Sequence, residues 1–187
     1  MLEIRFHGRG GQGTVVASKA LAFAVAREGR FVQTFPEYGV ERRGAPVVAF
    51  TRIDEEPIYI RSKIYEPDHL VVLEPTLIGA IDVTEGLKPG GWIIINSDKK
   101  AADFSQFKGF KVATIDATSI AVKYRLGSSA APIVNTAILG ALSKITGFVG
   151  LDAVRDAVRE IAPVKKDENV KASEEAYEIA EAEQEQP

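Results

Sequence analysis

The stretch HGRGGQGT, residues 7–14, constrains this chain more than any other part of its sequence. It joins a short apolar run, residues 2–6, to an alanine-rich segment, residues 14–28, that is apolar on nearly all sides. This order predicts a strand, a tight turn and a buried helix. Glycines let the backbone approach a ligand, and the unpaired N–H groups at a helix start attract anions. The candidate residues for a phosphate or cofactor site are Gly8, Arg9, Gly10, Gly11, Gln12 and Gly13.

Two other interpretations of this glycine loop stay open. A dinucleotide site also needs an acidic residue at the end of the second strand, about 20 residues further on. The strand expected over residues 31–35 is followed by Pro36 and Glu37, which comes late and matches this requirement poorly. Alternatively, the glycines serve close packing of helix on strand without any ligand, and Gln12 faces water.

Apolar runs of strand length predict the rest of the sheet. Residues 69–73, 92–96 and 111–115 are typical of parallel strands that are covered on both faces. Residues 47–53 and 58–61, joined by DEEP, predict an antiparallel β-hairpin. Leu77, Ile78 and Ile81 predict a helix between two of the parallel strands, and Asp116 is a candidate N-cap for another. The fold class is therefore α/β, with one Rossmann-like, open, mostly parallel sheet, helices on both faces, an antiparallel hairpin and extra C-terminal helices.

The C-terminal part is predicted to be helical. Pro132 marks the start of a helix that ends near Gly147, and residues 151–161 form the next one. We expect residues 1–164 to form the α/β domain and residues 165–187 to add an acidic helix and tail to that same domain. From residue 165 onward, eight acidic residues accompany three lysines. This segment is either a solvated helix with a frayed end or an arm that packs on a partner through Val170, Tyr177 and Ile179.

Composition excludes several functions. The chain has no cysteine, so it cannot form a disulfide, a thiolate zinc site, a cysteine nucleophile or an iron–sulfur cluster of its own. Its net charge of −3 gives no basic surface for phosphates, so nucleic acid is not an expected partner. No apolar stretch approaches the ~20 residues that span a bilayer, and no secretory signal precedes the first strand. We expect a cytoplasmic protein without a membrane partner.

A second informative segment, FPEYGVERRGAPVVAFTRI, follows the expected second strand. Together with GRGGQGT, VNTAILGALSKITGFVGLDAV and DENVKASEEAY, in this order, it covers nearly the whole chain from Gly8 to about Tyr177. With these motifs the chain resembles the gamma subunit of pyruvate and related 2-oxoacid:ferredoxin oxidoreductases. The resemblance implies a part in the oxidative decarboxylation of a 2-oxoacid, with pyruvate as the expected substrate. The products are an acyl-CoA, carbon dioxide and reduced ferredoxin.

The resemblance also implies where the cofactors lie. Thiamine diphosphate, magnesium and iron–sulfur clusters belong to the partner subunits alpha, beta and delta, and ferredoxin is reached through the complex. This agrees with the missing cysteines and with the missing Gly-Asp-Gly of the usual thiamine diphosphate motif. The gamma subunit itself docks on its partners, binds no cofactor tightly, and is a candidate to help bind coenzyme A.

The charged residues of the second segment have two possible roles. The arginines are forked donors suited to the phosphates of coenzyme A. Alternatively, the acidic and basic side chains form ion pairs that shape the loop or contact a partner subunit. The candidate interface or ligand residues are Glu37, Tyr38, Glu41, Arg42, Arg43 and Gly44.

No residue stands out as catalytic or metal-binding. His7 and His69 have no second ligand nearby in the sequence and are interpreted as structural. Asn135 is interpreted as a helix cap, with a packing role or a functional polar contact as the alternatives. Ser128 has no base that would activate it. We therefore predict no self-contained catalytic site. Two other functions remain as alternatives, a stand-alone NAD-binding Rossmann-like oxidoreductase and a purely structural interaction module.

Overall fold

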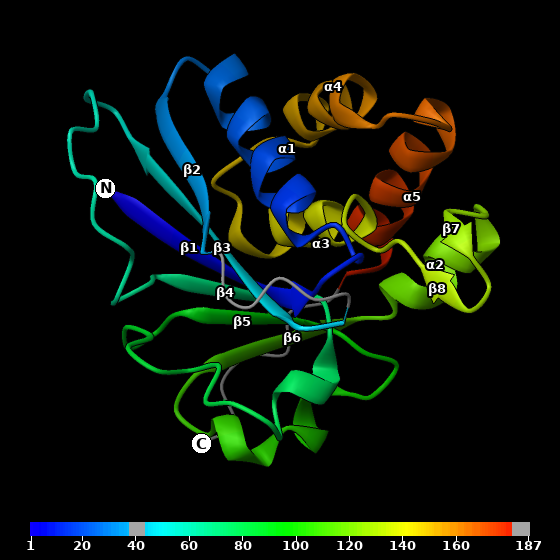
Figure 1. Ribbon diagram of the computed structural model, residues 1–187, viewed down its shortest axis with the longest axis horizontal. Helices are drawn as coiled ribbons and strands as arrows, with labels where there is room; N and C mark the ends of the chain where they lie inside the picture. The colour runs from blue at the N-terminus through cyan, green and yellow to red at the C-terminus, as the bar shows by residue number, and fades with distance from the viewer. Residues whose placement is uncertain (38–43, 181–187) are drawn as a thin grey trace.

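The computed structural model describes residues 1–37 and 44–180 of the chain. A six-stranded sheet runs through the molecule in the order β2-β3-β1-β4-β5-β6 (Figure 1). Strands β1, β4, β5 and β6 are parallel to one another, whereas β3 is antiparallel to both β1 and β2. The bounds are β1 (Leu2–Arg9), β2 (Phe31–Glu37), β3 (Pro46–Asp54), β4 (His69–Val72), β5 (Trp92–Asn96) and β6 (Lys111–Ile115). The predicted α/β class with an open, mostly parallel sheet is confirmed.

The inner parallel strands are buried on both faces, which explains their unbroken apolar sequences. In β4, Val71 packs into a cluster on one face of the sheet, whereas Leu70 and Val72 pack into a second cluster on the other face. Ile94 in β5 joins the first cluster, and its neighbours in sequence join the second. Apolar residues are therefore required at consecutive positions, because the side chains on both faces of the sheet are buried away from water.

The predicted hairpin has a different second strand. Strand β3 pairs with β2 on one side and with β1 on the other, so the antiparallel hairpin is β2–β3. Residues 58–61 are not a strand, and the prediction was wrong there. Both edges of β3 are already hydrogen-bonded, which leaves no edge for this segment to join. Strand β2 lies at one edge of the sheet, and it carries Pro36 opposite Ala49.

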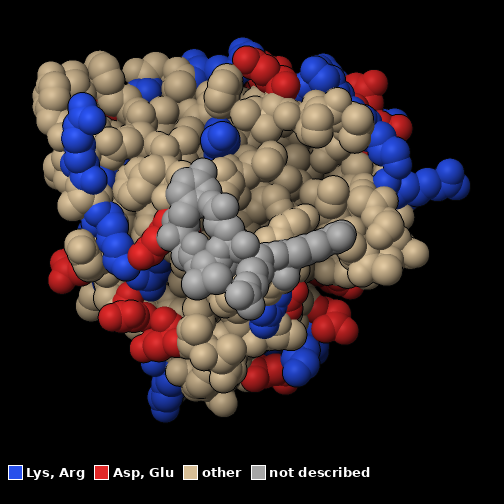
Figure 2. Space-filling model, viewed as in Figure 1, with Lys and Arg blue, Asp and Glu red and all other residues tan. Residues whose placement is uncertain are grey.

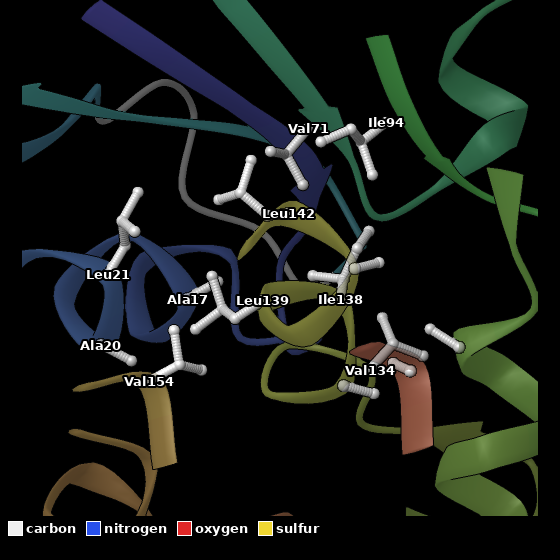
Figure 3. Packing of buried hydrophobic residues seen from close by; sticks show 14 of the residues in the cluster. Ala17, Ala20, Leu21, Val71, Ile94, Val134, Ile138, Leu139, Leu142 and Val154 are labelled. Carbon is white, nitrogen blue, oxygen red and sulfur yellow. The ribbon is translucent and has the colours of Figure 1, made fainter. Parts of the chain in front are cut away.

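The α-helices contribute to a cluster on one face of the sheet. They are α1 (Thr14–Arg27), α2 (Ala117–Lys123), α3 (Ala137–Thr146), α4 (Leu151–Ile161) and α5 (Lys166–Ile179). Figure 3 shows that Leu142 of α3 points toward Val71 of the sheet, while Leu139 points toward Ala17 of α1. Helix α3 is therefore buried almost all round, between the sheet and the other helices.

Short 3-10 helices cover the opposite face. They are η1 (Pro75–Leu77), η2 (Ala101–Asp103) and η3 (Ser105–Phe107). The predicted α-helix through Ile81 was wrong: one 3-10 turn follows β4, and Ile81 is exposed. Asp82 explains the difference, because its carboxylate accepts hydrogen bonds from the backbone and side chain of Thr84. Such a local turn competes with helical hydrogen bonding.

The C-terminal helices form part of the same core. Helix α5 approaches α3 so closely that a Cβ atom on Gly140 would lie 1.8 Å from the carbonyl oxygen of Ser173. Val170 is buried in this core, so it is not available to a partner, whereas Ile179 is 53% exposed. The frayed end predicted beyond Ala180 lies outside the described residues. No helix within residues 1–37 and 44–180 has the length and apolar character needed to cross a membrane.

The segment before α3 also differs from the prediction. Pro132 does not begin a helix, because it lies in a small antiparallel hairpin formed by β7 (Gly127–Ser128) and β8 (Ala131–Pro132). Helix α3 begins five residues later, at Ala137. It ends as predicted at Gly147, whose φ of 68° is the left-handed conformation that terminates helices.

Candidate functional site

The candidate site lies where the parallel strands end. After β1 the chain continues to β2 and β3, which lie on one side of β1 within the sheet, and after β4 it continues to β5 and β6 on the opposite side (Figure 1). The direction in which strands are added therefore reverses between β1 and β4. Ligands of open α/β sheets bind beyond the carboxyl ends of the strands at such a point. A crevice of about 600 Å³ occupies this place. Residues from the ends of β4, β5 and β6 line it together with Gly10, Gly11 and Gln12 of the glycine loop.

The glycine loop is held in a tight turn between β1 and α1. Gly13 is the N-cap of α1 with a φ of 82°, and Gly11 has a φ of 97°. Both values favour glycine strongly. The N–H of Gly10 donates to the carbonyl oxygen of Ala45 at 2.9 Å, which joins the loop to the segment before β3. A Cβ atom on Gly8 would lie 2.1 Å from Oγ1 of Thr14, so this position also needs a glycine.

The start of α1 offers free donors. No side chain caps this helix within the described residues, and its first turn contains no acidic residue. The N–H groups of a first helical turn have no partners inside the helix. The turn around Gly11 and Gly13 thus combines uncapped backbone donors with the positive end of the helix dipole, which is the arrangement that binds anions.

Gln12 fixes the loop from within. Its Oε1 accepts a hydrogen bond from the backbone N–H of Arg9 at 2.8 Å, and its Nε2 donates to Glu74 at 2.6 Å. Burial works against the charged form of Glu74, but hydrogen bonds from Thr76 and Gln12 outweigh it and lower its pKa. A carboxylate therefore stands beside the loop. Because both ends of the Gln12 amide are hydrogen-bonded, this side chain positions the loop.

Arg9 ties the loop to its neighbours on two sides. Its guanidinium donates to the carbonyl oxygen of Gly44 at 3.0 Å and to the hydroxyl of Thr76 at 3.2 Å. Gly44 has a φ of 85°, as a turn glycine requires. The second predicted segment therefore reaches the glycine loop through Gly44, and the two motifs meet in space.

The remaining residues of the second segment are only partly described. Glu37 forms an ion pair with Lys63 at 2.9 Å, and this hydrogen bond raises the pKa of the Lys63 ammonium group. Tyr38, Glu41, Arg42 and Arg43 lie outside the described residues. Their role as ligands or as interface residues stays a prediction.

The far wall of the crevice contains polar residues that the sequence did not single out as a site. The Asn96 amide donates to the carbonyl oxygen of Leu73 and to the Thr118 hydroxyl, both at 3.0 Å. Asp116 caps α2 as predicted, accepting a hydrogen bond from the N–H of Ser119 at 2.8 Å. Both Asn96 and Asp116 stand at the carboxyl end of an apolar strand, and this position is the signal that could have marked them.

The two histidines lie outside the crevice. Nε2 of His7 accepts a hydrogen bond from Nε of Arg5 at 3.0 Å, so its proton is on Nδ1, which has no partner among the described residues. Burial, followed by the charge of Arg5, lowers the pKa of His7 to about 3. Nδ1 of His69 accepts from the backbone N–H of Trp92, and its ring stacks on Phe148. These contacts fit the structural role predicted for both histidines, although only one of the two ring nitrogens of His7 has a hydrogen-bond partner among the described residues.

Asn135 does not have the predicted role. The N-cap of α3 is Thr136, and no side chain caps this helix within residues 44–180. The Asn135 amide lies instead against the glycine loop, where a Cβ atom on Gly13 would be 2.3 Å from its Nδ2. Asn135 was named from its place near a helix start, but only the folded chain brings it to Gly13.

Comparison with known proteins identifies the family. The family model described as pyruvate ferredoxin/flavodoxin oxidoreductase matches residues 3–179. The chain belongs to this family. It is 52% identical over 181 residues to the pyruvate/ketoisovalerate oxidoreductases common subunit gamma of Thermococcus kodakarensis, which covers 95% of this chain and 96% of the relative. It is 50% identical over 178 residues to the pyruvate synthase subunit PorC of Methanocaldococcus jannaschii, with 95% and 96% covered.

A solved structure supports the same assignment. The crystal structure of pyruvate oxidoreductase subunit PORC from Thermotoga maritima matches with a TM-score of 0.83 and 36% identity over 98% of both chains. The resemblance to a gamma subunit that the sequence motifs predicted is therefore confirmed.

Proposed function

We propose that this chain is the gamma subunit of a multisubunit 2-oxoacid:ferredoxin oxidoreductase that acts on pyruvate. The complex would oxidise and decarboxylate pyruvate with coenzyme A, giving acetyl-CoA, carbon dioxide and reduced ferredoxin. The observation that carries this proposal is the match to gamma subunits of pyruvate oxidoreductases along almost the whole chain. The enzyme would work in the cytoplasm.

The chemistry of electron transfer would take place in partner subunits. This chain has no cysteine to ligate an iron–sulfur cluster. The clusters would therefore lie in partner subunits, and on the family resemblance we assign them, together with thiamine diphosphate and magnesium, to the alpha, beta and delta subunits. The gamma chain would contribute a docking surface and a place for coenzyme A.

Coenzyme A would bind at the glycine loop. Its phosphates suit the uncapped N–H groups of α1 near Gly11 and Gly13. Arg42 and Arg43 precede Gly44, which contacts the loop, and would reach the same phosphates. In the crevice beyond the loop, Asp98 and Asp116 stand past the ends of β5 and β6. These two carboxylates accept hydrogen bonds from hydroxyl or amino groups and repel phosphates, so the phosphates would bind at the loop rather than in this part of the crevice.

Two experiments test this function. Native purification with a tag on this chain should recover a brown, iron-containing assembly that makes acetyl-CoA from pyruvate. A colourless chain that binds NAD without partners would contradict the proposal. Calorimetric titration of the assembly with coenzyme A should then give a weaker Kd for the double variant Arg42→Ala and Arg43→Ala. Unchanged affinity would remove the arginines from the site.

A further inference from the structure

A second cavity lies behind the glycine loop, on the other side of residues 131–136. Its volume is about 440 Å³, and its walls are largely apolar. Ala131, Pro132 and Val134 line the crevice, whereas Ile133, Asn135 and Thr136 line the second cavity. Over residues 132–134, which precede a turn at residues 135–136, neighbouring residues alternate between the two cavities, as they do in extended backbone. Gly11 borders both cavities, so one ligand that crosses the loop can enter both.

The second cavity contains a buried amide with an unused acceptor. The Asn135 side chain lies beside Gly13 and is only 5% exposed. Its Oδ1 has no hydrogen-bond partner within the described parts of the chain. A buried polar atom without a partner costs free energy, and such atoms are rare in folded proteins. Only an N–H or O–H group can donate to this oxygen.

Strained backbone lies beside this cavity. Lys165 lines it and Arg125 precedes the lining residue Leu126, and both have positive φ values, 51° and 55°, although neither is a glycine. The Lys165 ammonium group donates to the carbonyl oxygen of Arg125, which joins the two residues. Gly127 is also left-handed, and a Cβ atom there would lie 2.4 Å from the carbonyl oxygen of Ala131. Such strain persists only where the surroundings enforce it, and it gathers at ligand sites.

We propose that the second cavity binds the uncharged, N–H-bearing part of the ligand whose phosphates lie on the glycine loop. The body of this group packs against Val16, Leu126 and Ile133, and its N–H donates to Oδ1 of Asn135. The phosphates then lie at the start of α1, next to Gly11 and Gly13. The identity of the ligand rests on the proposed function. In coenzyme A, two parts offer this chemistry, the adenine base and the amides of the pantetheine arm.

Titration of the full chain with each part separately tests the proposal. The probes are adenosine 3′,5′-bisphosphate and pantetheine, and the readouts are calorimetry and the NMR signals of the Asn135 side-chain amide. One probe should shift these signals and bind about tenfold more weakly to Asn135→Leu, which removes one hydrogen bond. The probe that does so identifies the part in the cavity. Gln106→Leu makes the same chemical change on an exposed 3-10 helix, η3, on the opposite face, and should bind as the unaltered chain does.

Other outcomes overturn the proposal. If neither probe moves the Asn135 signals, or if Asn135→Leu binds both with unchanged affinity, the cavity is not a site for this group. Coenzyme A that binds the assembled complex equally well with and without Asn135→Leu also refutes it, while the proposed function stands. Coenzyme A that fails to bind the unaltered assembly refutes the coenzyme part of the proposed function instead. A melting curve for each variant shows that it is folded.

Discussion

Gln12 and Asn135 are two side-chain amides on opposite sides of the same glycine loop, and their surroundings differ. Gln12 accepts a hydrogen bond from Arg9 and donates one to Glu74, so its amide is satisfied by the chain itself. Asn135 is more deeply placed among apolar residues, yet its Oδ1 has no partner within the described ranges. A satisfied amide stabilises the loop, whereas an unsatisfied one lowers stability in the absence of a ligand. Gln12 therefore acts as part of the scaffold of the loop, whereas Asn135 is the residue that we propose for ligand binding.

The largest expected effect on stability comes from His7, which also has a buried nitrogen without a partner in the described structure. An unpaired buried atom therefore does not by itself mark a binding site. The pKa of His7 is lowered to about 3 in the folded chain, whereas an unfolded chain has the ordinary value near 6.5. Between pH 6.5 and pH 3 the unfolded state therefore binds up to one proton more than the folded state. The contribution of His7 to stability is complete above that pH and is lost as the pH falls toward 3.

We expect this loss to be on the order of 3 kcal/mol between pH 6.5 and pH 4. Urea unfolding at several pH values measures it. Glutamine does not titrate, so the free energy of unfolding of the unaltered chain should fall relative to that of His7→Gln as the pH is lowered from 6.5 to 4. His69 and the carboxylates are common to both proteins and cancel. Parallel pH profiles would show that His7 is not a pH-sensitive group.

Gly13→Ala breaks the contact between the loop and Asn135. An alanine at this position would keep a φ of 82°, which strains the backbone of any residue with a side chain. Its Cβ atom would lie 2.3 Å from Nδ2 of Asn135, so overpacking adds to the backbone strain. We expect a loss of about 3 kcal/mol in the free energy of unfolding. Gly11→Ala is the matched control, because its φ is also positive but its Cβ atom meets nothing within 4 Å. It should cost only about 1 kcal/mol, and equal losses would mean that Asn135 does not fill the space behind Gly13.

Gln12→Leu removes the satisfied amide. It leaves the Arg9 N–H and one side of the Glu74 carboxylate without their partner. We expect the free energy of unfolding to fall by about 2 kcal/mol at pH 7. The lowered pKa of Glu74 means that its stabilising bonds are present above the unfolded pKa and are lost as the pH falls. The difference in the free energy of unfolding between the unaltered chain and Gln12→Leu should therefore shrink as the pH falls. A difference that does not change with pH would argue against the hydrogen bond between Gln12 and Glu74.

Asn135→Leu removes the unsatisfied amide and should have the opposite sign. A leucine of similar size leaves no buried acceptor, so the ligand-free chain should gain about 1 kcal/mol in stability. Thermal and urea unfolding without ligand measure this gain. A loss of similar size would indicate that Asn135 has a structural hydrogen bond, and the contrast with Gln12 would disappear.

The sequence predicted the strands better than it predicted their pairing. Residues 92–96 and 111–115 are strands with the expected bounds, because burial on both faces leaves an apolar run that is easily recognised. Pairing depends on which edges are free, and the sequence contains no direct sign that β3 inserts between β1 and β2. The helix expected through Ile81 failed for a local reason, since Asp82 forms a turn with Thr84.

The candidate site was predicted in part. The glycine loop was recognised because its residues are consecutive and stand between a strand and a helix. Asn96 and Asn135 lie 39 residues apart in sequence and border different cavities, so only tertiary structure brings each of them to the loop region. Figure 2 shows charged side chains of both signs around the rim of the face that it draws. Such a distribution cannot be read from a net charge of −3.

Pro36 in the edge strand β2 has a consequence for assembly. Proline has no N–H, so a foreign strand laid along this border could not form a continuous ladder with it. At this edge, partner subunits are therefore expected to contact the chain through side chains and loops, because a shared intermolecular sheet at β2 would be interrupted. The same residue should also hinder edge-to-edge stacking of separate chains along β2.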